Sequence, residues 1–112
     1  MESFNKLSKE IYLNNVKNGW DGDNFLVNIC LIHTEISEAV EDYRNNKQIT
    51  ELEFIKDKNN NFKPIGIPSE LADIVIRVLD VCGRYNIDIE TAIRKKIDYN
   101  TTRGYKHGGK KV

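Results

Sequence analysis

Residues 70–84, ELADIVIRVLDVCGR, predict a helix that is apolar over most of its circumference, and this helix decides the fold. Pro68 precedes it, and Ser69 is the expected N-cap. The only polar stripe of the helix is about 80° wide and consists of Glu70, Asp73, Arg77 and Asp80. A helix this apolar is expected to be nearly surrounded by protein. Its polar stripe therefore faces either a strip of solvent or a polar cavity. On the surface, Asp73 and Arg77 would form an ordinary i, i+4 ion pair.

Residues 24–44 predict a second helix, capped by Asp23 or Asn24. At about 100° per residue, one face is apolar and is the expected core face: Ile29, Ile32, Ile36, Val40 and Tyr43. Three carboxylates adjoin this face within an arc of about 60°, namely Glu35, Glu38 and Asp42. Glu41 lies farther toward solvent. Charged carboxylates beside apolar core residues are costly to desolvate, so their presence there suggests a function.

Two shorter helices complete the expected fold. One covers about residues 4–17 after a Ser3 cap, and the other about residues 89–102 after an Asp88 cap. The connection 45–69 breaks the helical pattern with Asn clusters, a glycine and two prolines, so we expect either a small hairpin or a mobile flap there. The prediction is one domain, residues 1–112, with an all-α fold: a bundle of about four helices.

The composition excludes several classes of protein. The chain has 112 residues, with 17 Lys or Arg and 17 Asp or Glu, so no net charge would draw it to nucleic acid or a membrane. No apolar run approaches the roughly 20 residues of a membrane span, and the N-terminus lacks an apolar signal region. Cys30 and Cys82 lie singly in apolar runs and are expected to be buried thiols. We expect a cytoplasmic protein without a nucleic-acid or membrane partner.

The carboxylates of the two long helices become informative if they meet. Two carboxylates about 5 Å apart repel by roughly 3 kcal/mol at an effective dielectric constant of about 20, so a converging group needs protons or a cation. The residues concerned are Glu35, Glu38, Glu70 and Asp73. All-oxygen ligands favour Mg²⁺, with Mn²⁺ as a substitute, over zinc. Because Mg²⁺ usually completes its shell with phosphate oxygens and water, the pattern predicts a phosphate-bearing substrate.

The last predicted helix carries a matching basic region. Lys96, Asn100 and Arg103 share one arc of this helix. The arc continues an apolar face that we expect to be buried, formed by Ile89, Ile93 and Ile97. A face that is apolar at one end and cationic at the other would run from the core into a site. The alternative is a frayed helix end with ordinary surface lysines.

Three short motifs follow one another along the predicted helices: Glu35-x-x-Glu38, Glu70-x-x-Asp73 and Lys96-x-x-x-Asn100-x-x-Arg103. They lie in the segments HTEISEAVEDYR (33–44), KPIGIPSELADIVIRVLD (63–80) and KIDYNTTR (96–103). Together these segments resemble the MazG-like all-α nucleoside triphosphate pyrophosphohydrolases. The tail RGYKHGGKK (103–111) resembles that of one bacterial and phage branch, so the likeness spans roughly residues 24–110.

The resemblance implies magnesium-dependent hydrolysis of a nucleoside or deoxynucleoside triphosphate to the monophosphate and pyrophosphate, by attack of water at the α-phosphorus. In that family the positions that match the four acidic residues of the first two motifs hold the metal. The positions that match Lys96, Asn100 and Arg103 are expected to contact the nucleotide. We expect Glu38 to activate the water, since a carboxylate can orient or deprotonate it.

Other candidate residues have competing interpretations. Trp20, in NGWDG, either stacks on a base or plugs the core, as a lone Trp beside a helix end more often does. His33 lies away from Glu35 on its helix and is expected to be packed or on the surface. The tail residues His107, Lys110 and Lys111 either fold onto phosphates or belong to a disordered basic tail.

Four short helices expose much apolar surface, and the nearly all-round apolar helix suggests burial against a partner. We therefore expect a homodimer or homotetramer. The competing functional hypothesis is a non-catalytic helical interaction module whose acidic stripe contacts a basic partner. Convergence of the carboxylates distinguishes the two hypotheses, because catalysis needs them around one point whereas a partner-binding stripe can spread along a surface.

Overall fold

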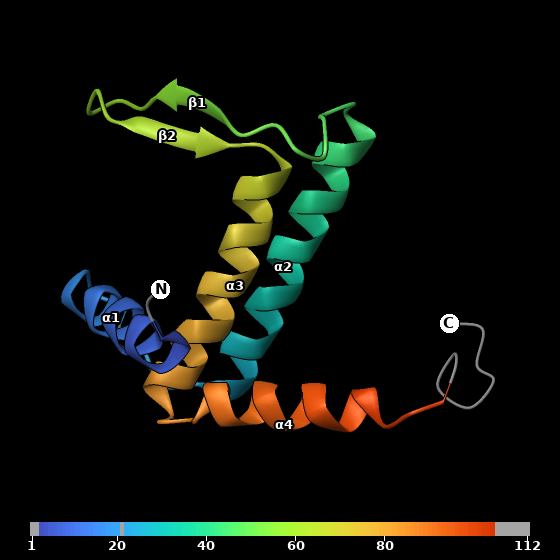
Figure 1. The fold of residues 1–112 in the computed structure, drawn as a ribbon. Coiled ribbons are helices and arrows are strands. Elements are labelled where there is room, and N and C mark those ends of the chain that lie inside the picture. The colour runs from blue at the N-terminus through green and yellow to red at the C-terminus, as the bar shows by residue number, and fades with distance from the viewer. Residues whose placement is uncertain (1–2, 21, 105–112) are drawn as a thin grey trace.

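A computed structural model describes residues 3–20 and 22–104. The described residues form four helices and one antiparallel two-stranded sheet (Figure 1). In chain order they are α1 (Phe4–Lys17), α2 (Phe25–Arg44), β1 (Glu53–Lys56), β2 (Phe62–Ile65), α3 (Ile67–Arg84) and α4 (Ile89–Thr101). The predicted all-α fold of about four helices is confirmed.

Helix α3 is the centre of the fold. Helix α1 packs on one side of it, and α2 runs antiparallel to it on the other (Figure 1). The hairpin extends from the end where α2 stops and α3 begins, whereas α4 leaves from the opposite end of α3 and contacts α1. The α2–α3 interface therefore lies between the hairpin at one end and α4 at the other.

The caps predicted for three helices are present. Ser3, Asn24 and Asp88 each accept a hydrogen bond through the side chain from a backbone N–H three residues later. Asn24, rather than Asp23, caps α2. Asn5 ties α1 to the start of α4, because its Oδ1 accepts from the Ile89 N–H at 3.1 Å.

Helix α3 begins at Ile67, earlier than predicted, and Ser69 is not its cap. Gly66 occupies the cap position with a φ of 106°. A Cβ there would lie 2.6 Å from the carbonyl oxygen of Glu51, so the position requires glycine. The Ser69 hydroxyl donates instead to the Pro64 carbonyl oxygen at 3.1 Å, which fastens the hairpin to the helix.

The connection 45–69 contains the hairpin that we considered as one of two alternatives. Its register pairs Glu53 with Ile65 and Lys56 with Phe62. The Asp57 side chain closes the turn by accepting from two backbone N–H groups of the turn, at 2.8 and 3.0 Å. This hairpin fills most of the long connection.

The core of the described chain is small. Its buried side chains are Ser8, Glu35, Ile67, Leu79, Val81 and Cys82. The predicted core face of α2 is wrong in its second half, since Ile36, Val40 and Tyr43 are exposed. Helix α3 covers only one side of α2, and no other element of residues 3–20 and 22–104 covers this face.

Two other burial predictions need correction. Cys82 is buried as expected, but Cys30 is exposed. On α4, Ile89 and Ile93 are half-buried while Ile97 is exposed, because α4 rests on the chain only near its beginning. Among the described residues, none of the helices combines the length and the apolar character that a membrane crossing requires.

Helices α1 and α3 are in close contact at Gly83. A Cβ built there would lie 2.5 Å from the Ser8 carbonyl oxygen and 2.8 Å from the Tyr12 Cβ. The buried Ser8 hydroxyl donates to the Leu79 carbonyl oxygen one turn earlier. The absence of a side chain at position 83 therefore sets the distance between the two helices.

This close approach predicts that Gly83→Ala destabilises the protein, although alanine gains about 1 kcal/mol over glycine in a helix. The new methyl group meets rigid backbone, so we expect a net loss of about 1–3 kcal/mol in the free energy of unfolding. Urea denaturation followed by circular dichroism measures it. Gly104→Ala is the control, since a Cβ there meets nothing within 4 Å. A more stable Gly83→Ala variant would contradict the packing.

Candidate metal centre and adjoining cavity

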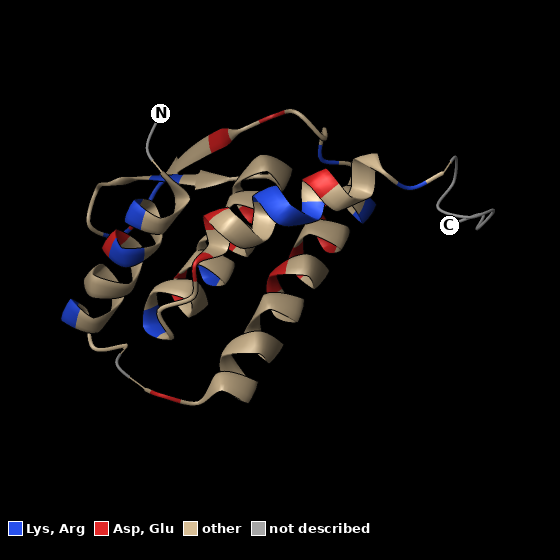
Figure 2. Cartoon of the chain, turned by 60° about the horizontal axis from the view of Figure 1, so that its bottom comes forward, with Lys and Arg blue, Asp and Glu red and all other residues tan. Residues whose placement is uncertain are grey.

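Carboxylates of α2 and α3 meet where the two helices pass each other. Glu35 and Glu38 lie one turn apart on α2, and Glu70 lies in the first turn of α3. One carboxylate oxygen from each of these three residues lies within 4.8 Å of the others. We call Glu35, Glu38 and Glu70 the carboxylate cluster. Figure 2 shows that the acidic positions of α2 gather in its second half, beside those of α3.

The carboxylate cluster is partly shielded from water. Glu35 is buried, Glu70 is half-buried and Glu38 is exposed. The Oε2 atom of Glu70 is buried without a hydrogen-bond partner among the described residues. Burial, then the close approach of the Glu38 carboxylate and the charges of Glu38, Asp42 and Asp73, raise the pKa of Glu70 to about 7. Near neutral pH the cluster therefore retains a proton for part of the time, which a cation can replace.

Asp73, the fourth predicted ligand, lies one turn after Glu70 and outside the group within 4.8 Å. It lines a cavity together with Glu35. Burial raises the pKa of Asp73, the charge of Glu35 adds to this rise, and the charges of Arg77 and Lys63 oppose it. The structure thus brings three of the four predicted carboxylates together and places the fourth beside them, within electrostatic reach.

Arg77 pairs across the helix interface and not along its own helix. Its Nε donates to Oε1 of Glu35 at 2.7 Å. The surface ion pair that we considered between Arg77 and Asp73 is not formed in the described structure. Because Glu35 is buried, its charge needs a partner, and Arg77 supplies it.

A cavity of about 670 Å³ adjoins the carboxylate cluster. It lies among the end of α1, the α1–α2 connection, the first half of α2 and the middle of α3. Its lining includes Trp20, Asn28, Leu31, Glu35, Ile76 and Arg77. This volume and this mixture of apolar and polar side chains are typical of a small-molecule site. Glu35 and Arg77 belong to both the cavity and the ion pair at the cluster.

Asn28 lies in the cavity wall. Its buried Nδ2 is close to the Tyr85 hydroxyl, which itself donates to Asp23 at 2.5 Å. The amide is a polar group of the cavity wall that a ligand could contact. Asn28 lies two turns before Glu35 on the same face of α2.

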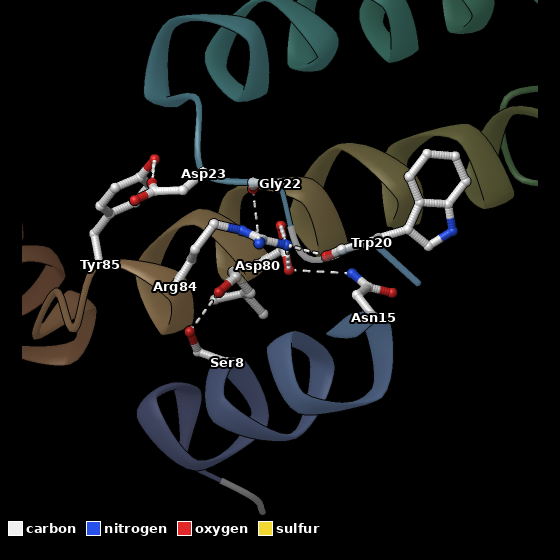
Figure 3. Close-up of polar contacts among 9 residues, drawn as sticks. Ser8, Asn15, Trp20, Gly22, Asp23, Asp80, Arg84 and Tyr85 are labelled. Atoms are coloured by element: carbon white, nitrogen blue, oxygen red, sulfur yellow. Dashed lines mark hydrogen bonds and ion pairs between the residues drawn. The ribbon is translucent and has the colours of Figure 1, made fainter. Parts of the chain in front are cut away.

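Arg84 holds Trp20 at the cavity (Figure 3). Its guanidinium donates to the carbonyl oxygens of Trp20 at 2.9 Å and Gly22 at 3.0 Å, and it pairs with Asp80 at 3.3 Å. Asp80 also accepts from Asn15 Nδ2 at 3.1 Å. Trp20 itself is 71% exposed. The interpretation of Trp20 as a core plug is therefore wrong, and its ring is free to contact a ligand.

The predicted nucleotide-contacting residues, in and just after α4, lie elsewhere in the same chain. Lys96, Asn100 and Arg103 are exposed, and the charged groups of Lys96 and Arg103 each lie 5.7 Å from the ring centre of Tyr99. Helix α4 begins after the end of α3 opposite to the one that carries Glu70 (Figure 1). Within one chain, these three residues are therefore not part of the carboxylate cluster or the cavity.

The remaining candidates are quickly placed. His33 is exposed on α2, which agrees with the surface interpretation. His107, Lys110 and Lys111 lie outside the described residues. Three residues of the site were not singled out from the sequence in their observed roles, namely Asn28, Arg77 and Arg84.

The raised pKa of Glu70 predicts how the stability of the metal-free protein depends on pH. The folded protein holds this proton up to about pH 7, whereas the unfolded chain releases it near the ordinary value of 4.5. The free energy of unfolding should therefore fall as the pH rises from about 4.5 through 7.

Glu70→Gln removes the titrating group and should flatten this decline. Urea denaturation in EDTA at several pH values between 5 and 8 measures it. Glu41→Gln is the matched control, because Glu41 is exposed on α2 and outside the cluster. An equal pH dependence in the wild type and the Glu70→Gln variant would show that Glu70 does not carry the proton.

The chain was compared with known proteins in three ways. Protein-family models, curated proteins and solved structures all yield no match. The likeness to the MazG-like enzymes therefore rests on the three motifs of the sequence.

Proposed function

We propose that this protein is a MazG-like nucleotide pyrophosphohydrolase, which uses Mg²⁺ to hydrolyse a nucleoside or deoxynucleoside triphosphate to the monophosphate and pyrophosphate. The observation that supports this proposal most is the meeting of Glu35, Glu38 and Glu70 within 4.8 Å. Two of the three sequence motifs contribute to this meeting, from separate helices. A stripe that only contacts a basic partner requires no such meeting, so the interaction-module hypothesis is the weaker one.

The donor set fits a hard divalent cation. All the available ligand atoms are carboxylate oxygens, and the buried Glu70 Oε2 lacks a partner in the described structure. Glu35, Glu38 and Glu70 would hold the ion, with Asp73 as a fourth ligand. Mn²⁺ suits the same donors. The bound ion would neutralise charge on the phosphates and polarise them for attack.

Glu38 is suited to act on the attacking water. It is the exposed member of the cluster, so solvent reaches it while Glu35 stays buried. Its carboxylate would orient the water and accept a proton as oxygen bonds to the α-phosphorus. The bond between the α-phosphorus and the oxygen that bridges to the β-phosphorus then breaks, and pyrophosphate leaves with that oxygen.

The cavity would accept the nucleoside part of the substrate. Its wall continues from Glu35 of the cluster to Asn28 and Trp20. The exposed Trp20 ring can stack on a base, and the buried Asn28 amide can donate to an acceptor on the base or sugar. The phosphates would then extend from the cavity toward the cluster.

A second copy of the chain would complete the site. The exposed apolar residues of α2, Ile36, Val40 and Tyr43, recur at helical spacing and form a stripe that no described segment covers. Stripes of this kind usually mark interfaces. In a homodimer or homotetramer packed on them, α4 of one chain could bring Lys96, Asn100 and Arg103 to the cluster of another.

A screen of nucleoside triphosphates for release of pyrophosphate tests the activity. We expect turnover that requires Mg²⁺ or Mn²⁺, and a fall of at least a hundredfold in kcat for Glu38→Gln. Glu41→Gln, on the same helix but outside the cluster, should remain active. Mg²⁺ should also raise the melting temperature of the wild type. A protein that neither binds the ion nor releases pyrophosphate would instead favour the interaction module.

Mixed oligomers test whether α4 acts on a neighbouring chain. Lys96→Met keeps the apolar stem of the side chain and removes its charge, so the variant should fold normally and lose activity. Co-expression with Glu38→Gln should then restore about a quarter of the wild-type rate, since half of randomly formed dimers are mixed and each has one intact site. Absence of recovery, with mixed oligomers demonstrated by differential tags, would place Lys96 in its own chain's site, whereas full activity of Lys96→Met alone would place it outside any site.

A further inference from the structure

Arg77 occupies the border between the carboxylate cluster and the cavity. Its Nε donates to Glu35 at 2.7 Å, and its side chain also lines the cavity. This is the only hydrogen bond that the guanidinium makes among the described residues, which leaves the two terminal nitrogens free. The side chain is 40% exposed, compared with 9% for that of Glu35. Arg77 thus has one bond toward the protein and several donors toward the cavity.

The ion pair with Arg77 compensates the charge of the buried Glu35 carboxylate, and this compensation is needed only while no metal ion is bound there. A buried carboxylate is strongly unfavourable unless a cation or donors compensate it. Glu35 is the most buried acidic side chain of the described site, and Arg77 is the cation that reaches it. Any divalent ion that used Glu35 as a ligand would provide the same compensation.

The ion and the guanidinium would then repel each other. Both are cations, and both would bind the Glu35 carboxylate at short range, in surroundings where charges are weakly screened. A triphosphate changes this balance, because it brings several negative charges to the same place. Arginine binds phosphate oxygens well through its fork of N–H donors.

We propose that Arg77 is a placeholder cation that couples metal binding to substrate binding. In the free protein it neutralises Glu35. When the metal and the triphosphate arrive together, the ion takes over Glu35 and the guanidinium turns to the phosphates in the cavity. This inference rests on the proposed function, and it adds the order of events: the metal binds productively with the triphosphate and only weakly alone.

The proposal is a statement about coupling between two ligands, so it can be measured without turnover. Isothermal titration calorimetry would give the affinity for Mg²⁺ alone and in the presence of inorganic tripolyphosphate, which contains no base. We expect the wild type to bind Mg²⁺ about five- to a hundredfold more tightly with tripolyphosphate than expected from the two separate affinities. Arg77→Gln should bind Mg²⁺ alone more tightly than the wild type and lose most of this coupling.

Two further variants sharpen the comparison. Arg77→Lys keeps the charge but not the planar fork, so Mg²⁺ alone should bind as weakly as in the wild type while the coupling falls. This variant also retains a partner for Glu35 if Arg77→Gln proves unstable. Arg94→Gln removes the same charge from an exposed side chain on α4 and should match the wild type in both measurements.

The possible results separate this inference from the proposed function. If Arg77→Gln keeps the full coupling, or binds Mg²⁺ alone more weakly than the wild type, Arg77 only positions Glu35 and the placeholder role is wrong, even where the wild type releases pyrophosphate. If the wild type neither binds Mg²⁺ nor hydrolyses a triphosphate, the proposed function fails first and the inference falls with it. Tighter binding of Mg²⁺ alone together with lost coupling supports the placeholder role.

Discussion

The close contact of α1 with α3 at Gly83 is the constraint on which the rest of the structure depends. A side chain there would meet the backbone of α1, so glycine lets one flank of α3 be covered tightly. The buried Leu79 and Cys82 belong to the same end of α3. Helix α2 runs along the other flank of α3, from the contact of Phe25 with Tyr85 to the carboxylate cluster near the start of α3. With α1 on one flank and α2 on the other, α3 carries Glu70 to the acidic residues of α2.

The site itself works against the stability of the chain. Three carboxylates share a small, partly buried space, and burial together with the neighbouring carboxylates raises the pKa of Glu70. Arg77 relieves Glu35, but the Glu38–Glu70 contact has no cation in the described structure. Structural carboxylates are normally arranged in the opposite way, each with its own donor or counterion. An arrangement that is unfavourable without a ligand is expected where binding energy of a ligand compensates for it.

The sequence predicted the local structure of this chain well because local signals are strong in it. The caps Ser3 and Asp88 and the ends of all four helices follow from periodicity and capping chemistry, with α3 mistaken at its start because Gly66, at a positive φ, took the place expected for Ser69. The convergence of Glu35, Glu38 and Glu70 could be anticipated, since each lies beside an apolar stripe. The partner of Arg77 could not, because the i, i+4 spacing along its own helix favoured Asp73, whereas packing selects Glu35 of α2. Asn28 had a usable signal, its two-turn spacing from Glu35 on the same face of α2.

Burial was predicted least well, and the physical reason lies in how periodicity works. An apolar stripe shows that a surface avoids water, without showing which molecule covers it. Ile36, Val40 and Tyr43 continue the stripe of Ile29 and Ile32 without interruption, yet α3 covers only the half-buried beginning of it. Ile97 repeats the situation on α4. A single domain of this length normally buries most of its large apolar side chains, so these uncovered stripes fit the proposed second copy better than a complete monomer. Packing of a second copy on α4 would also explain why the cations of α4 lie away from the cluster of their own chain. Ile97 and Lys96 are neighbours on α4, so the segment that covers Ile97 also determines where Lys96 lies.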